Sequence, residues 1–191
     1  MNFGIVVEGN QDSAAYPELI KKIRDDIESI FPIPCGGVGT LKKEFINSLK
    51  QFKWRAPHSI DKALVIMDSD CADAFVWEER LGQIYEQSHF KPTFPVHFHA
   101  TKCKLETWLL ADENAINQAS QQRGKNKRVT AVTIDLESNK GAKELFQKQL
   151  SRADLPATPR VYQEIASFAK IARIAERCPL FKQFVLKVRA C

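Results

Sequence analysis

Two stretches of the sequence decide the fold: FGIVVEGNQD at residues 3–12 and ALVIMDSD at residues 63–70. Each begins with a short apolar run, typical of a strand buried on both faces of a parallel sheet, and each run ends abruptly in acidic residues. After the first run, apolar residues recur at three- and four-residue spacing over residues 13–30, which predicts an amphipathic helix. This order of strand, tight turn and helix predicts an α/β fold, because parallel strands need crossover connections.

The rest of the chain continues the alternation of strands and helices. Further strands are expected within 32–40 and 93–99, and further helices over 41–52, 72–87 and 105–119. We therefore predict an α/β, Rossmann-like, mostly parallel sheet flanked by helices, with a more helical C-terminal third. Residues 1–120 would form the core, and residues 121–191 a basic loop and helical extension packed on it.

Charge is unevenly distributed along the 191 residues, whose net charge is +5. Residues 1–100 hold 11 Lys and Arg against 14 Asp and Glu, whereas residues 101–191 hold 17 against 9. A basic half suits a polyanion such as nucleic acid, because neutralised phosphates release counterions. The alternative, a basic protein without a polyanionic partner, stays open on charge alone.

The five cysteines are odd in number, widely separated and form no CxxC pair. This pattern argues against a disulfide framework and against a zinc knuckle, and it favours a reducing, cytoplasmic location. No stretch of about 18 apolar residues occurs, and the N-terminus has no basic segment of the kind that begins a signal peptide. We therefore expect neither a membrane span nor secretion.

Acidic residues follow the two strongest predicted strands. Glu8 comes directly after the first, and Asp68 and Asp70 come after the other. If these strands are parallel neighbours, the three carboxylates project from one sheet edge, where oxygen ligands select Mg²⁺ or Mn²⁺. The alternative is that an Asp here caps the next helix, which applies to Asp70 most directly.

Glu8-Gly9 and Asp68-x-Asp70 together resemble the TOPRIM domain of topoisomerases, primases and OLD-type (overcoming lysogenisation defect) nucleases. Asp12, four residues after Glu8, brings the pattern nearer to the OLD-type nucleases. The segments LETWLLAD (105–112) and ARIAERCPLFKQF (172–184) are similar to a small stand-alone TOPRIM-like family of unassigned function. Its genes are often found beside SMC/ABC-type ATPases in bacterial defence loci.

The resemblance implies Mg²⁺-dependent phosphodiester hydrolysis of nucleic acid, gated by an ATPase partner in phage defence. It assigns Glu8 as a metal ligand or general acid/base, Asp68 and Asp70 as metal ligands, and Asp12 as a ligand of a second ion. No tyrosine carries a motif that marks a topoisomerase nucleophile. The alternatives are a regulatory or binding subunit without turnover, and a phosphoesterase acting on small molecules.

Several further residues are candidates for the same chemistry. Glu106 lies at the border of an apolar helical stripe, so it is either a catalytic residue or an ion-pair partner of Lys102. Lys102 and Lys104 follow a strand end, where a lysine could neutralise the scissile phosphate. The basic loop 121–128 would contact a nucleic-acid backbone through Arg123, Lys125, Lys127 and Arg128.

Two aromatic features leave both a functional and a structural interpretation open. Trp54, between Lys53 and Arg55 in a basic predicted helix, could stack on a base or belong to the core. Phe181, Phe184, Val185 and Val188 recur at helical spacing and could form a docking surface or pack inside.

Overall fold

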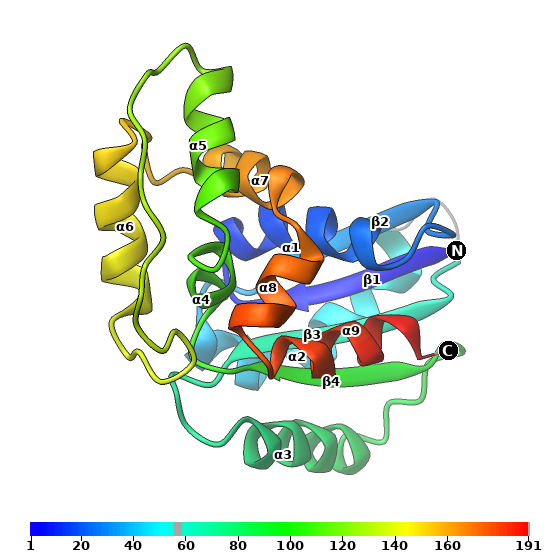
Figure 1. The fold of residues 1–191 in the computed structure, drawn as a ribbon. Helices are drawn as coiled ribbons and strands as arrows, with labels where there is room; N and C mark the ends of the chain where they lie inside the picture. Colours follow the sequence, from blue (N-terminus) through cyan, green and yellow to red (C-terminus); the bar gives the residue numbers. More distant parts are fainter. Residues whose placement is uncertain (56–58, 191) are drawn as a thin grey trace.

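The computed structural model describes residues 1–55 and 59–190. Within them, one parallel sheet has four strands in the order β2-β1-β3-β4 (Figure 1). The strands are β1 (Asn2–Val7), β2 (Ser29–Pro34), β3 (Lys62–Asp68) and β4 (Val96–Thr101). The predicted α/β class with a parallel sheet is confirmed.

Helices cover both faces of the sheet. One hydrophobic core joins the sheet to α2 (Val38–Arg55) and α3 (Ala74–Gln87). The other joins it to α1 (Asn10–Ile23) and to the helices after β4. Those helices are α4 (Leu105–Leu109), α5 (Glu113–Gln122), α6 (Ala142–Arg152), α7 (Pro159–Phe168), α8 (Ile171–Arg177) and α9 (Phe181–Arg189). Among the described residues, no helix is long and apolar enough to cross a bilayer.

The two central strands bury side chains on both faces, as their continuous apolar runs predict. Ile5 and Leu64 point into the core beneath α1, whereas Val6 and Val65 point into the core beneath α2 and α3. All four are completely buried. The sheet is therefore a rigid platform whose carboxyl edge positions the loops that follow it.

Two predicted helices are wrong in extent. The first ends at Ile23 rather than near residue 30, because residues 29–34 form β2, which pairs beside β1. The helix predicted over 105–119 is two helices: α4 ends at Leu109, and Asp112 caps α5 by accepting a hydrogen bond from Asn114 N at 3.2 Å. The break turns α5 away from the sheet (Figure 1).

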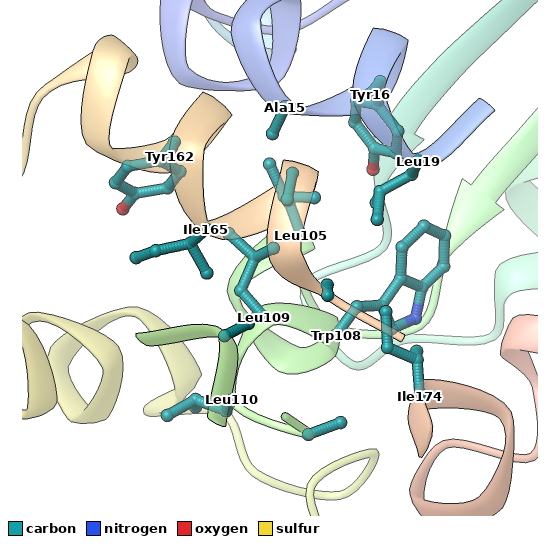
Figure 2. Close-up of a cluster of buried hydrophobic side chains, with 14 of the residues drawn as sticks. Ala15, Tyr16, Leu19, Leu105, Trp108, Leu109, Leu110, Tyr162, Ile165 and Ile174 are labelled. Carbon is teal, nitrogen blue, oxygen red and sulfur yellow. The ribbon is translucent and has the colours of Figure 1, made fainter. Parts of the chain in front are cut away.

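The C-terminal helices pack on α1 and α4 around Trp108 (Figure 2). The Trp108 ring lies 4.7 Å from the Phe181 ring and 5.0 Å from the Phe184 ring, centroid to centroid. Phe181, Phe184 and Val188 are completely buried, so the docking interpretation of these three residues is wrong. They belong to the core that α1 shares with the end of the chain.

A disulfide joins Cys71 to Cys103, contrary to the expectation from cysteine spacing. Both residues lie just beyond the ends of adjacent parallel strands, and Asp70 N donates a hydrogen bond to Cys103 O at 3.1 Å. Strand pairing therefore brings together two cysteines that are 32 residues apart in sequence. Cys35 and Cys178 are free thiols in the described part of the chain.

Candidate functional site

The carboxyl ends of β1 and β3 lie side by side, as the metal-site hypothesis requires. The two strands are parallel neighbours, with Val6 opposite Val65. Glu8 Oε1 accepts a hydrogen bond from Asp68 N at 2.8 Å. One strand's carboxylate is thus fixed to the backbone of the other strand's end.

The side chains of Asp12 and Asp68 each accept a hydrogen bond from a backbone N–H group. Asp12 lies in the first turn of α1, where Oδ2 accepts a hydrogen bond from Gly9 N at 2.8 Å. Asp68 Oδ1 accepts one from Leu105 N, the first residue of α4, at 3.2 Å. This second contact draws the start of α4 to the sheet edge and brings Glu106 to the carboxylates.

Glu106 is only 6% exposed, and its Oε1 accepts a hydrogen bond from the Tyr162 hydroxyl at 2.9 Å. The interpretation of Glu106 as the ion-pair partner of Lys102 is wrong, because Lys102 Nζ donates instead to the carbonyls of Cys71 and Ala72, at 3.2 and 3.0 Å. A carboxylate this deeply buried needs a donor or a cation, and α7 supplies the donor. Sequence reasoning missed Tyr162, because nothing in the sequence connects it to a residue 56 positions away.

The crowded carboxyl groups raise one another's proton affinity. Burial raises the pKa of Asp12 to about 7, with the charges of Glu106 and Glu8 adding to the effect. Burial raises the pKa of Asp68 well above its usual value, helped by Asp12, Glu8 and Glu106. Burial also raises the pKa of Glu8. Such a cluster is stabilised by taking up a proton or by a cation.

Asp70 lies apart from this buried cluster. Its backbone is left-handed, with φ of 50°, and its side chain is 58% exposed and forms an ion pair with Lys104 Nζ. Burial alone would lower the pKa of Lys104, but the hydrogen bond and charge of Asp70 raise it overall. The four carboxylates that converge are therefore Glu8, Asp12, Asp68 and Glu106.

The converging side chains fit a hard divalent cation in the chemistry of their donors, which are all carboxylate oxygens. Across residues 1–55 and 59–190, no three His, Cys, Asp or Glu side chains already form a metal-binding arrangement. Burial and the neighbouring carboxylates raise the pKa values of Asp12 and Asp68, and a bound cation would offset both effects.

The residues predicted to contact nucleic acid differ in whether they form ion pairs within the protein. Arg123 forms a two-point ion pair with Glu164, at 2.6 and 2.9 Å, and Lys125 Nζ lies 2.9 Å from Asp154 Oδ2. Lys127 and Arg128 are exposed and border a polar pocket of about 350 Å³ beside α5. Their role in binding stays a prediction.

Comparison with known proteins supports the fold. The C-terminal region of the Burkholderia pseudomallei OLD protein has a similar structure, with a TM-score of 0.53 and 19% sequence identity over 98% of this chain and 96% of that one. No protein family and no curated protein matches the sequence. The resemblance of the sequence to OLD-type proteins is thus supported at the level of the fold.

Proposed function

We propose that this chain is a nuclease that hydrolyses phosphodiester bonds in nucleic acid with bound Mg²⁺ or Mn²⁺. The observation that carries the proposal is the convergence of Glu8, Asp12, Asp68 and Glu106 on one sheet edge, with a raised pKa for the first three. The fold shared with the OLD protein region supports the same conclusion.

In this proposal Glu8, Asp12 and Asp68 would hold the cation, and Asp70 would join them on leaving Lys104. The cation would neutralise the clustered charge and polarise a phosphoryl oxygen, which makes the phosphorus easier for water to attack. Glu106, whose carboxylate accepts a hydrogen bond from the Tyr162 hydroxyl, would accept a proton from that water. Lys104, released from Asp70, would then face the scissile phosphate.

The basic residues and the partner form the rest of the proposal. Lys127 and Arg128, with Lys102, Arg123 and Lys125, would contact the nucleic-acid backbone. An SMC/ABC-type ATPase would gate the reaction, in the cytoplasm of a bacterium defending itself against phage. This part rests on the resemblance to the stand-alone TOPRIM-like family.

The test compares Asp68→Asn with the matched control Glu79→Gln, a substitution at an exposed carboxylate on α3. Each protein is incubated with duplex DNA, single-stranded DNA, RNA or bis(p-nitrophenyl) phosphate, in Mg²⁺, Mn²⁺ or EDTA, and Mn²⁺ binding is measured by calorimetry. We expect cleavage and Mn²⁺ binding to be lost in Asp68→Asn and kept in Glu79→Gln.

Three results would lead to other conclusions. Cleavage that persists in Asp68→Asn contradicts the proposed site. Hydrolysis of the small ester alone indicates a small-molecule phosphoesterase. Binding of nucleic acid without Mn²⁺ binding or cleavage, with or without an ATPase partner, indicates a regulatory subunit.

A further inference from the structure

A cleft of about 660 Å³ lies at the edge of the sheet opposite the carboxylates. It is lined by the end of α2, by the residues just before β3 and by the connection from α3 to β4. These segments all precede their strands, so the cleft is at the amino edge. The length of β3, seven residues, separates it from Asp68 by roughly 20 Å.

The floor of the cleft is rigid and aromatic. Phe52 is 3% exposed, and its ring meets the Phe94 ring edge to face at 6.3 Å between centroids. Phe52 also packs directly over Gly4 of β1, where a Cβ would come within 2.8 Å of the ring. The floor is thus anchored to the central sheet.

Trp54 stands at the cleft with 81% of its surface exposed, so the core interpretation of this residue is wrong. The other two tryptophans are covered: Trp108 is 1% exposed, and Lys42 Nζ lies 3.5 Å from the ring centroid of Trp77. The Trp54 ring is not isolated, because it lines the cleft together with Phe90 and Phe94, and a contiguous apolar surface of this kind marks a binding site.

Cations lie near the rings of Trp54, which is exposed, and of Phe90, which is half-buried. Lys53 Nζ lies 5.6 Å from the Trp54 centroid, and Lys50 Nζ lies 5.9 Å from the Phe90 centroid. Lys91 also lines the cleft, where its Nζ forms an ion pair with Glu86, and no Asp or Glu lines the cleft among the described residues. The side chain of Arg55 and residues 56–58 lie outside the described part. The cleft therefore offers aromatic faces and positive charge together, which is the combination that holds unpaired bases and their phosphates.

We propose that this cleft binds unpaired nucleotides of single-stranded nucleic acid. A base stacks on Trp54, and Lys50 and Lys53 attract the flanking phosphates. Bases inside a duplex do not offer their faces to a ring, so the cleft discriminates in favour of single strands. The inference rests on the proposed function only in its choice of nucleic acid as ligand, because the cleft is separate from the carboxylates.

The experiment measures tryptophan fluorescence during titration with an oligo(dT) strand or a duplex of equal length, in EDTA so that no cleavage occurs. We expect the single strand to quench the emission of the wild-type protein and of Trp77→Phe, which keeps the reporter. Trp54→Ala should abolish the quenching and weaken binding about 5- to 150-fold by fluorescence anisotropy of a labelled strand. Trp54→Phe should bind more tightly than Trp54→Ala, since a ring remains, and the circular dichroism of each variant checks its fold.

Two further measurements test binding at the cleft independently of cleavage. Asp68→Asn should keep full quenching, because its substitution is at the opposite edge. Lys50→Ala with Lys53→Ala should flatten the slope of log K against log salt by about 0.7 for each lost contact. The proposal is overturned if Trp54→Ala binds the single strand as tightly as wild type, or if single strand and duplex quench equally. Absence of any quenching also overturns it.

Discussion

Replacing Asp12 with Asn should make the metal-free protein more stable at pH 8. The pKa of Asp12 is raised from 3.8 to about 7, because the carboxyl group is buried beside Glu106 and Glu8. A native state that prefers the protonated form is stabilised below pH 4, and this contribution is lost as the pH rises to about 7. A pKa rise of this size lowers the stability of the native state at pH 8 by at most about 4 kcal/mol. Asn avoids that loss and keeps an oxygen for the hydrogen bond from Gly9 N.

The assay is urea unfolding of the wild type and Asp12→Asn in EDTA at pH 4 and pH 8, repeated at pH 8 with Mg²⁺. The two proteins should differ little at pH 4, and the variant should be the more stable at pH 8. Mg²⁺ should raise the stability of the wild type more than that of the variant, since binding to the native state stabilises it. The reasoning is refuted if the variant is less stable at both pH values, because Asp12 would then act only as a helix cap.

Three other substitutions probe the packing around the two edges of the sheet. Gly4→Ala should lower the free energy of unfolding by about 1–3 kcal/mol, because its Cβ would come within 2.8 Å of the Phe52 ring; an unchanged urea midpoint would argue against that close contact. Cys71→Ser, which removes the disulfide to Cys103 across 32 residues, should cost about 3–4 kcal/mol under oxidising conditions and nothing extra in reductant. Tyr162→Phe leaves a buried carboxylate oxygen without its donor and should cost about 1–3 kcal/mol in the same assay, whereas equal stability would show that water replaces the hydroxyl.

The central part of the candidate site could be predicted, because residues that follow adjacent parallel strands meet at one edge of the sheet. Glu8 and Asp68 adjoin because apolar runs fix which segments become buried strands, and parallel pairing of those strands then brings their carboxyl ends together. The same reasoning did not predict the position of the Asp70 side chain, which lies apart from the other carboxylates. Its left-handed backbone turns the carboxylate out toward Lys104, and that conformation is a property of the loop rather than of the strand period.

The contacts that sequence reasoning did not find come from tertiary packing. The bond from Tyr162 to Glu106 depends on where α7 lies against α1, and apolar periodicity specifies which face of a helix is buried but not what it meets. The Cys71–Cys103 bridge depends likewise on β4 pairing with β3. Trp54 had two interpretations in the sequence, and only the exposure of its side chain decided between them.

The burial of Trp108 under Phe181 and Phe184 has a consequence for synthesis on the ribosome. All four strands have been made by residue 101, and Glu106 follows five residues later, yet Phe181 and Phe184, whose rings cover Trp108, are translated only after α5, α6, α7 and α8. A nascent chain that stops before α7 therefore holds Glu8, Asp12, Asp68 and Glu106 but lacks Tyr162, the hydrogen-bond donor of Glu106. Glu106 gains that donor only when α7 has been made and has packed.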